Sequence, residues 1–349
     1  MTEAPRPLKQ EQEQATDIVT EVAPGIFRTQ LPANITGLGH VNMYVLEDER
    51  GVAVVDPGLP TKESWQAIQQ RLKQIGVPLK RVHSVIITHS HPDHFGGAAR
   101  IRDETQADII THRLFRMWWD PSEPPDLEPE ELAIIMRNPT EKPPWGGEPM
   151  VIPWKKSRFS RTHKNPARMF SMPTPTVRLR EAERMTFARR EWVALHTPGH
   201  TEDHLCLFDP EGGVLISGDH VLPQITPHIS GLSANDDPLA LFFGSLDKVG
   251  ALGPQVNLVL PAHGHPFHNL SQRTEEIKQH HLERLQRLRD TSATLGRPAS
   301  VMEMSTHLFS ARAQGPMADS ETYAHLEHLR QMGDFECRSE EGLLKYVLH

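Results

Sequence analysis

The chain has few cysteines and no long apolar run. Its 349 residues include two cysteines, Cys206 and Cys337, which lie far apart and form no C-x-x-C pair. This excludes a disulfide framework and a thiolate metal site, so we expect two reduced thiols, as in cytosolic proteins. No apolar stretch reaches the ~18–20 residues of a membrane helix, and residues 1–20 are too polar for a secretory signal. We therefore expect a cytoplasmic enzyme that has no membrane partner.

An excess of positive charge is also lacking. The sequence has 37 Lys and Arg against 45 Asp and Glu, which gives a formal net charge of −8. An acidic chain is not a general polyanion binder, which leaves only a local basic segment for that role. One such segment exists, because residues 154–170 carry six basic side chains, no acidic ones and interleaved aromatics. This composition predicts either an anion-binding surface or an ordinary solvated loop.

The order of apolar segments predicts an α/β core over residues 21–270, preceded by a flexible tail over residues 1–20. Short apolar runs with the pattern of buried strands alternate with amphipathic helices, which is typical of an α/β fold. One helix is expected to begin at Thr61, one near Phe95 and one near 237. The expected strands are 41–47, 51–56, 84–88, 108–111, 191–196, 204–209, 213–217 and 256–261.

Residues 113–175 interrupt this core with a different composition. They contain 12 of the 30 prolines and four of the six tryptophans. Proline at this density blocks long helices and sheet ladders, so we expect an elaborated loop with one short helix near 128–137. Long loops in compact domains are usually functional, and tryptophans favour an ordered cover over the site. These tryptophans are Trp118, Trp119, Trp145 and Trp154.

From residue 271 onward the pattern becomes helical and predicts a small separate domain. Two helices are indicated by apolar spacing, and a third is expected from Ser320 to Met332 with Gly333 as its cap. A hairpin around the polar turn 339–342 follows, and three helices with a two-stranded wing are typical of a winged-helix domain. Residues 271–349 hold ten Lys and Arg against twelve Asp and Glu, so nucleic acid binding is not favoured.

The 21 histidines include a dense group in the segment THSHPDHFGG, residues 88–97. His89 and His91 follow a predicted strand, and a spacing of two residues directs both imidazoles to one side of an extended backbone. Asp93 and His94 follow where the chain turns into a helix. Four side chains able to bind metal can therefore face one cavity from this strand-to-helix loop.

Three further side chains able to bind metal each follow a predicted strand: His200, Asp219 and His263. Strand ends in an α/β sheet meet at one crevice, so we expect these three to converge with the first group. Imidazole suits zinc and iron, and a carboxylate can bridge two cations. Two cations ~3.5–4 Å apart can hold a hydroxide nucleophile between them, and no Ser-His-Asp or activated-cysteine pattern offers an alternative nucleophile.

The order H-x-H-x-D-H, then His, Asp and His, resembles the signature of the metallo-β-lactamase superfamily. The resemblance covers roughly residues 22–270 and implies an αββα sandwich with two divalent metal ions. Zinc is the first candidate for these ions, and iron and manganese are the alternatives. Glyoxalase-II-like and lactamase-beta-like hydrolases are the most similar branches, and the latter carry a C-terminal winged helix. The implied ligands are His89, His91 and His200 for one metal ion, Asp93, His94 and His263 for the other, and Asp219 between them.

Two more residues are expected to support the ligands from behind. Asp56 ends the predicted strand 51–56 and matches the structural aspartate of the superfamily. His220 directly follows Asp219 and is the preferred supporting histidine. The other histidines next to ligands are His204, His228 and His265, and for all four a supporting role, a substrate contact or a solvated position stays open.

The favoured function is hydrolysis of a thioester or ester, as in hydroxyacylglutathione hydrolase, by a hydroxide that bridges two metal ions. Asp93 is expected to orient this hydroxide and to pass a proton to the leaving group. We expect an anionic small-molecule substrate, and a homodimer is compatible with the sequence. A phosphodiesterase or endoribonuclease, a lactone hydrolase and a non-catalytic metal-dependent binding module stay open. No tyrosine lies near Asp219 in sequence, which disfavours the lactone hydrolase.

Overall fold

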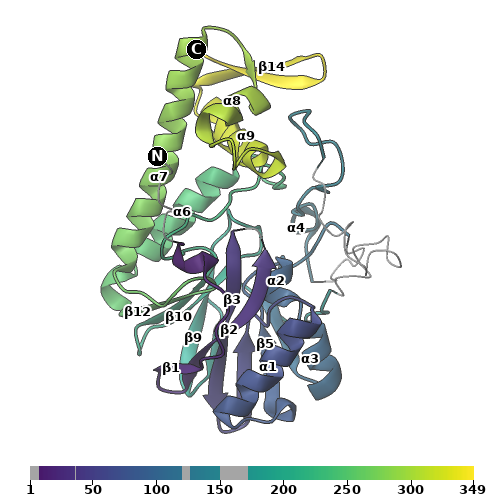
Figure 1. Ribbon diagram of the computed structural model, residues 1–349, viewed down its shortest axis with the longest axis vertical. Helices are drawn as coiled ribbons and strands as arrows, with labels where there is room; N and C mark the ends of the chain where they lie inside the picture. The colour runs from purple at the N-terminus through teal and green to yellow at the C-terminus, as the bar shows by residue number, and fades with distance from the viewer. Residues whose placement is uncertain (1–7, 36, 120–125, 150–171) are drawn as a thin grey trace, which may run out of the picture.

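The computed structural model describes residues 8–35, 37–119, 126–149 and 172–349, and these residues form two stacked sheets between helices (Figure 1). The first sheet contains β1 (Thr20–Ala23), β2 (Ile26–Ile35), β3 (Leu38–Asp48), β4 (Gly51–Val55), β5 (Val82–Ile86), β6 (Asp108–His112) and β7 (Val177–Leu179). The second sheet contains β8 (Arg184–Phe187), β9 (Arg190–His196), β10 (Leu205–Asp209), β11 (Val214–Gly218) and β12 (Leu258–Pro261).

Both sheets combine antiparallel and parallel pairs. The first has the strand order β1-β2-β3-β4-β5-β6-β7, antiparallel from β1 to β4 and parallel from β4 to β7. The second has the order β12-β11-β10-β9-β8, with only the β11–β12 pair parallel. Parallel neighbours end at the same edge of a sheet, so the loops after β4 and β5, and those after β11 and β12, emerge together.

Side chains that alternate along the strands fill two layers of core. On β3, Tyr44 and Leu46 lie between the two sheets, whereas Met43 and Val45 lie under the outer helices. Successive strand residues point to opposite faces, so a strand buried on both faces must be apolar throughout. This explains why the core strands appear in the sequence as continuous apolar runs. The layer between the sheets also contains Ile26, Val55, Ile86, Trp192, Leu205, Leu207, Ile216 and Leu260.

Helices cover the outer face of each sheet. The amphipathic helix α1 (Lys62–Ile75) begins where Thr61 Oγ1 accepts a hydrogen bond from Ser64 N at 3.1 Å, and it ends at Gly76 in a left-handed conformation. Together with α2 (Pro92–Phe95) and α3 (Ala98–Thr105) it covers the first sheet. Helices α6 (Pro238–Gly250) and α7 (Leu270–Leu295) cover the second. Short 3-10 turns are η1 (Gln10–Gln12), η2 (Leu79–Arg81) and η5 (Gly253–Gln255).

The C-terminal region adds helices α8 (Val301–Leu308) and α9 (Pro316–Gln331) and a small sheet. Its strands β13 (Ala299–Ser300), β14 (Phe335–Glu340) and β15 (Leu343–Leu348) have the order β13-β15-β14. Three helices and a hairpin were expected here, and the short β13 was not. The fold is thus an αββα sandwich with a small C-terminal addition (Figure 1). None of the described helices is long and apolar enough to cross a membrane.

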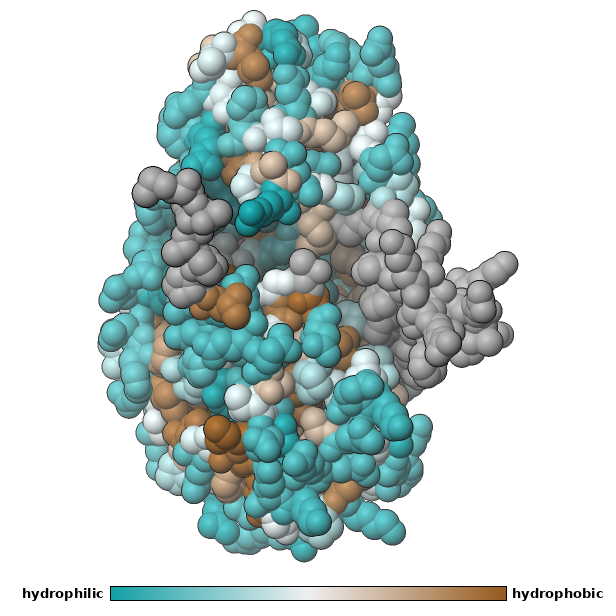
Figure 2. All heavy atoms as spheres, viewed as in Figure 1, coloured by the Kyte–Doolittle hydropathy of each residue, from teal (hydrophilic) through white to brown (hydrophobic). Residues whose placement is uncertain are grey.

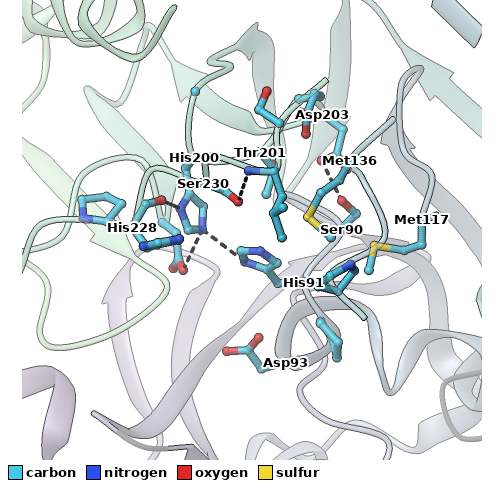
Figure 3. Close-up of a pocket in the computed structure, with 18 of the residues that line it drawn as sticks. Ser90, His91, Asp93, Met117, Met136, His200, Thr201, Asp203, His228 and Ser230 are labelled. Carbon is cyan, nitrogen blue, oxygen red and sulfur yellow. Dashed lines mark hydrogen bonds and ion pairs between the residues drawn. The ribbon is translucent and has the colours of Figure 1, made fainter. Parts of the chain in front are cut away.

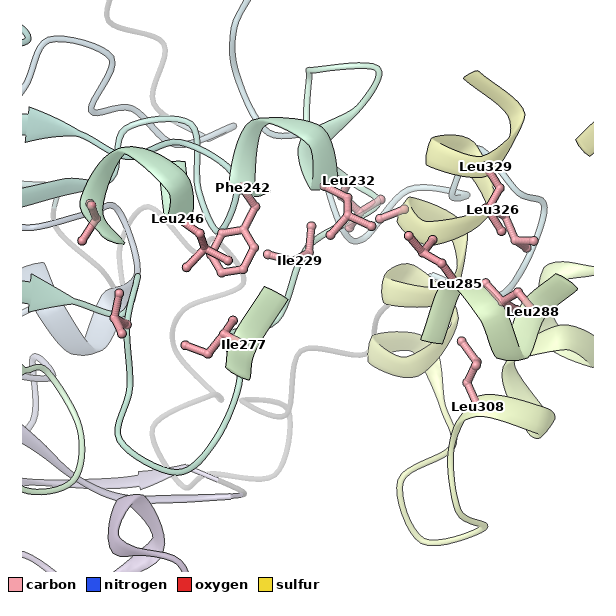
Figure 4. Close-up of a cluster of buried hydrophobic side chains, with 14 of the residues drawn as sticks. Ile229, Leu232, Phe242, Leu246, Ile277, Leu285, Leu288, Leu308, Leu326 and Leu329 are labelled. Atoms are coloured by element: carbon pink, nitrogen blue, oxygen red, sulfur yellow. The ribbon is translucent and has the colours of Figure 1, made fainter. Parts of the chain in front are cut away.

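One continuous hydrophobic cluster joins this addition to the sandwich. It runs from Phe242 and Leu246 on α6, through Ile277 and Leu285 on α7, to Leu326 on α9 (Figure 4). The helical segment begins close to residue 271, as expected, but the core does not divide there. The winged-helix assignment stays a prediction, and the C-terminal addition shares its core with the second sheet.

The expected flexible tail is wrong for residues 8–19, which pack against the body of the protein. Glu11 is fully buried, and its Oε1 accepts hydrogen bonds from Gln224 N at 2.7 Å and Ile225 N at 3.0 Å. Gly39 leaves room for this segment, because a Cβ there would lie 2.1 Å from Glu13 O. Polar backbone contacts hold the segment in place, so the lack of apolar residues was misleading.

The long insertion differs from its prediction in two ways. The helix expected near 128–137 is shorter, α4 (Pro129–Leu132). Trp145 does not cover the site but is 2 % exposed in the core next to Tyr323, with the ring centroids 5.0 Å apart. A buried indole therefore anchors the insertion to the C-terminal region. Trp154 and the basic segment 154–170 lie outside the described residues.

Candidate metal centre

Side chains from the ends of four strands, one of them continuing into α2, meet at one edge of the sandwich. His89 and His91 follow β5, Asp93 and His94 lie on α2, and single residues follow β9, β11 and β12, namely His200, Asp219 and His263. The structure brings all seven together in two groups, and within each group the potential ligand atoms lie within 4.8 Å of one another. These seven residues, called the metal centre below, are the ones that the sequence pattern predicted.

Three imidazoles and one carboxylate form the first group. His89 Nε2 lies 2.9 Å from His91 Nδ1, which lies 3.2 Å from His200 Nε2. His200 Nε2 is in turn 3.6 Å from Asp219 Oδ2. Two ligand atoms on a tetrahedral zinc ion, each ~2.0–2.1 Å from it, lie about 3.4 Å apart. The group therefore has the spacing of a tetrahedral ligand set.

The second group lies on the other side of Asp219. Asp93 Oδ2 is 3.6 Å from both His94 Nε2 and His263 Nε2. Asp219 Oδ1 is 3.3 Å from His263 Nε2, and Asp219 Oδ2 is 3.7 Å from His94 Nε2. One carboxylate thus contacts both groups, as a bridging ligand would.

The outer ring nitrogens of His89, His200 and His263 are held by the protein. His200 Nδ1 lies 2.7 Å from His228 O, and His263 Nδ1 lies 2.6 Å from His40 O. A carbonyl oxygen can only accept, so both Nδ1 atoms carry a hydrogen and donate it. This fixes the tautomer in which the lone pair of Nε2 faces the metal centre. His89 Nδ1 has a comparable partner in Thr88 Oγ1 at 3.0 Å.

Asp56 occupies the position behind the ligand loop that the sequence analysis expected. Its Oδ1 accepts from Thr88 N and its Oδ2 from Thr88 Oγ1, both at 2.8 Å, while His94 Nδ1 donates to Oδ2 at 2.9 Å. Asp56 has φ 54°, a left-handed conformation that is unusual for a residue with a side chain. The sharp turn after β4 directs the carboxylate under the β5–α2 loop and orients His94.

The supporting histidine from the second sheet is His204, and the preference for His220 was wrong. His204 Nε2 accepts a hydrogen bond from Asp219 N at 3.1 Å, and its Nδ1 lies 2.7 Å from Thr197 Oγ1. His220 forms no hydrogen bond with any of the seven described residues of the metal centre. Its ring packs edge-on against Phe242, 5.1 Å between centroids, and burial lowers its pKa to about 3. Adjacency in sequence to Asp219 therefore did not place the His220 ring in contact with the ligands.

The electrostatics divide the metal centre into a neutral and a charged side. Burial, together with the neighbouring imidazoles, lowers the pKa values of His89 and His91 well below the usual range. Burial also acts on His94, but the carboxylates of Asp93, Asp219 and Asp56 outweigh it and raise the His94 pKa to about 10. Neutral imidazoles with free lone pairs thus face buried carboxylates that attract positive charge.

Several buried atoms of the metal centre need a partner. Within the described part of the chain, His94 Nε2, His263 Nε2 and Asp219 Oδ1 are buried and have no hydrogen-bond partner. An unpartnered buried polar atom costs roughly 1–3 kcal/mol, and these three face one another. A cation between them would satisfy all three. The residues therefore fit divalent metal ions with nitrogen and oxygen ligands.

The metal centre lies at the floor of a cavity of about 490 Å³. Figure 3 shows Met117 and Met136 beside His91 on one side of this pocket and His228 beside His200 on the other. The described part of the insertion supplies one wall, and its role as a cover stays a prediction. Asp203 also lines the pocket. Its Oδ1 accepts from Ser90 Oγ at 2.9 Å, and burial raises its pKa to about 7.

The C-terminal region reaches this pocket through contacts that the sequence does not indicate. His228 Nδ1 lies 3.4 Å from Glu321 Oε2 on α9, and Glu321 forms an ion pair with Arg284 on α7. The carbonyl of His228 is the one that holds His200, so α9 supports the loop behind a potential ligand. No sequence motif marks this contact. His265 points away, toward Glu13 at 2.8 Å.

Comparisons with curated proteins find distant relatives along most of the chain. The probable metallo-hydrolase YqjP of Bacillus subtilis is 24% identical over 321 residues, 88% of this chain and 91% of that protein. An atrochrysone carboxyl ACP thioesterase of Passalora fulva is 28% identical over 72% of this chain and 57% of its own length. A hydroxyacylglutathione hydrolase of Albidiferax ferrireducens is 25% identical, covering 65% of this chain and 64% of that protein.

Solved structures have the same fold over nearly the whole chain. A metallo-beta-lactamase family protein from Thermus thermophilus has a TM-score of 0.71 and 29% identity, covering 94% of this chain and 100% of that one. A beta-lactamase domain protein from Burkholderia ambifaria has a TM-score of 0.74 and 26% identity, with 96% of both chains covered. The model of the metallo-beta-lactamase superfamily matches residues 36–289, which is more than half of the chain. This protein therefore belongs to the metallo-beta-lactamase superfamily and is a metal-dependent hydrolase.

Proposed function

We propose that the protein hydrolyses a thioester or ester with the help of two divalent metal ions, for which zinc is the first candidate. The observation that carries this proposal is the contact of Asp219 with both ligand groups, 3.6 Å from His200 on one side and 3.3 Å from His263 on the other. When bound, the metal ions would lower the pKa of a water molecule to near 7 and polarise the acyl carbonyl.

The protein's own residues would position the reactants and move one proton. The Asp93 carboxylate lies 3.6 Å from His94 Nε2 and from His263 Nε2 and would accept a proton from the attacking water. As the new carbon–oxygen bond forms and the carbon–sulfur or carbon–oxygen bond breaks, Asp93 would return this proton to the leaving group. The backbone partners of His200 and His263 keep the imidazoles in place during this change of charge.

Two relatives support the choice of an acyl substrate. One is named a thioesterase and the other a hydroxyacylglutathione hydrolase, and both names describe cleavage of a thioester. The three tyrosines, all within the described residues, do not line the cavity, which speaks against a lactone hydrolase that uses a tyrosine as oxyanion donor. Tyr44, for example, donates its hydroxyl to Pro261 O at 2.7 Å.

A turnover panel with metal-loaded protein tests this function. The panel contains S-lactoylglutathione, a simple acyl thioester, a lactone, a phosphodiester and single-stranded RNA. We expect hydrolysis of a thioester that Asp93→Asn reduces at least 100-fold, whereas Asp103→Asn, at an exposed position on α3, has no effect. RNA or phosphodiester cleavage that Asp93→Asn abolishes, without thioester cleavage, would overturn the proposal in favour of a nuclease.

A further inference from the structure

The cavity above the metal centre has three apolar walls that come from distant parts of the chain. The first wall belongs to the insertion, the second to the loop before α6, and the third to the β2–β3 turn. Met317, in the first turn of α9, completes the cavity from the C-terminal side. The apolar side chains that line it are Ile35, Leu38, Leu114, Met117, Ile134, Ile135, Met136, Leu222, Ile225, Leu232 and Met317.

Each charged side chain on these walls has a hydrogen-bond partner in the protein, although Arg116 Nε and Asp203 Oδ2 are buried without one. Arg116 Nη1 donates to Leu132 O at 3.0 Å, and Glu202 Oε1 accepts from Ala234 N at 2.9 Å. Asp203 accepts from Ser90, so its Oδ1 is taken as well. Apart from the metal centre and His228, these three are the charged or titratable side chains among the described lining residues. Such walls offer no row of cations for a phosphate chain or a tripeptide with several carboxylates.

The mouth of the cavity is apolar too. Ile35 is 40 % exposed and Met317 is 53 % exposed, and both line the cavity. A single exposed apolar residue is ordinary, but two at the mouth of one apolar cavity continue its surface to the solvent. In the space-filling view this face is hollowed between the C-terminal region and the sandwich, with apolar surface along the hollow (Figure 2). An apolar group can therefore enter without crossing a charged rim.

We propose that this cavity binds the apolar acyl chain of the substrate, which makes the enzyme a hydrolase of medium-chain acyl thioesters or esters. The inference rests on the proposed function, because it assumes that an acyl carbon reacts at the metal centre. The chain extends from there between Ile134–Met136 and the loop with Ile225 and Leu232. A cavity of about 490 Å³ is within the ~300–1,000 Å³ range of small-molecule sites and has room for such a chain.

The apolar walls point to recognition of the substrate by its apolar part. The anionic character expected from the sequence stays a prediction, because residues 154–170 lie outside the described residues and the described lining residues offer no cluster of cations. Burial of one methylene group favours binding about fourfold, from ~0.8 kcal/mol of transfer free energy. Chain length, rather than charge, is therefore expected to control how well a substrate is used.

A series of acyl thioesters with one leaving group tests this inference. N-acetylcysteamine thioesters of acetate, butyrate and octanoate keep the leaving thiol constant while the acyl chain grows. With the metal-loaded full chain we expect kcat/KM to rise at least 30-fold from acetyl to octanoyl. Equal or falling values along the series would overturn the inference and leave the hydrolase function intact.

Matched variants locate the effect in the cavity. Ile135→Ser and Ile134→Ser alter half-buried residues on the wall, and Leu282→Ser alters an apolar residue on α7 that is 39 % exposed and does not line the cavity. We expect the wall variants to lower kcat/KM for the octanoyl thioester at least fivefold and for the acetyl thioester less than twofold. Leu282→Ser should change neither. An equal loss for both thioesters in the wall variants would contradict the inference.

Binding without turnover separates the two proposals. Titration calorimetry with octanoate and acetate compares ligands that have the same carboxylate and differ only in the chain. We expect octanoate to bind at least 30-fold more tightly to the wild type, and this advantage to shrink in Ile135→Ser. Tight octanoate binding with no hydrolysis of any ester would refute the proposed function and support the cavity as an apolar site. Equal binding of the two acids would refute the cavity assignment.

Discussion

Among the described residues, two buried clusters of histidine and carboxylate side chains differ in the charge that they leave unbalanced. The metal centre leaves His94 Nε2, His263 Nε2 and Asp219 Oδ1 without hydrogen-bond partners among the described residues. The C-terminal cluster consists of His281, Glu321 and His325, also with potential ligand atoms within 4.8 Å of one another. Residue types and spacing alone therefore do not distinguish a metal site from a structural cluster.

Hydrogen bonds join the members of the C-terminal cluster, in which His281 Nε2 is buried without a hydrogen-bond partner. His325 Nδ1 lies 2.7 Å from Glu321 O and therefore donates to it, which leaves His325 Nε2 to accept from His281 Nδ1 at 3.0 Å. The Glu321 carboxylate is neutralised by Arg284. No excess negative charge remains to attract a cation, in contrast to Asp93 and Asp219 in the metal centre. A metal site therefore needs unbalanced negative charge as well as free lone pairs.

The largest expected effect comes from the residue that joins the two ligand groups. Asp219→Asn removes the charge that contacts both groups while it keeps the side-chain shape. We expect the bound metal, measured by elemental analysis, to fall by at least one equivalent and kcat/KM to fall at least 1,000-fold. Full metal content in Asp219→Asn would show that the carboxylate does not join the groups, and the contrast between the clusters would lose its basis.

Two buried carboxyl groups, one near each cluster, should make the stability of the fold depend on pH. Burial raises the pKa of Asp203 to about 7, whereas His228 and Arg284 hold the pKa of Glu321 below its usual range. The folded protein keeps the Asp203 proton between about pH 4 and pH 7 and the unfolded chain loses it, so this group destabilises the fold as pH rises through that window. Glu321 acts in the opposite direction. Its ionised carboxylate stabilises the fold above the pKa of the unfolded chain, and this stabilisation is lost as pH falls.

Asp203→Asn should therefore stabilise the protein more at pH 8 than at pH 4. With about 1.4 kcal/mol per pKa unit, the difference between the two pH values is at most ~4 kcal/mol in the free energy of unfolding. Urea denaturation in the presence of a chelator measures it, and Asp103→Asn serves as the exposed control. A pH-independent effect of Asp203→Asn would mean that Asp203 ionises normally.

The aspartate behind the ligand loop should have a smaller effect on metal than Asp219. Asp56→Asn keeps an acceptor for Thr88 but weakens the hydrogen bond with His94 at 2.9 Å. Such supporting carboxylates typically contribute 10–100-fold to metal affinity. Competition with a chromogenic chelator should show a loss in this range for one of the ions. An unchanged affinity would show that Asp56 has only a structural role in the loop.

The smallest effect on metal is expected in the C-terminal cluster. His325→Leu leaves His281 Nδ1 without a partner and should cost ~1–3 kcal/mol of unfolding free energy. Metal content and kcat/KM should stay within twofold of the wild type. A loss of one metal equivalent in His325→Leu with normal activity would identify a third metal site and would contradict the assignment of this cluster as purely structural.

Much of the metal centre could be predicted because its residues follow apolar strands. His89 and His91 after β5, and Asp219 after β11, lie at positions that strand periodicity and parallel pairing direct to one edge. The four strands β1, β2, β7 and β8 were missed, because three of them are short, half-exposed edge strands and β2 is interrupted by Pro32. Partial burial leaves no continuous apolar run to recognise.

Local periodicity and spaced motifs in the sequence were enough to predict the fold class and to predict that the seven residues and Asp56 lie close together. Only the tertiary structure decided that His204 rather than His220 supports Asp219, that residues 8–19 pack against the body, and that Trp145 joins the insertion to the C-terminal core. These outcomes depend on contacts between segments far apart in the chain. Such contacts are set by how the layers pack, and local sequence carries no record of them.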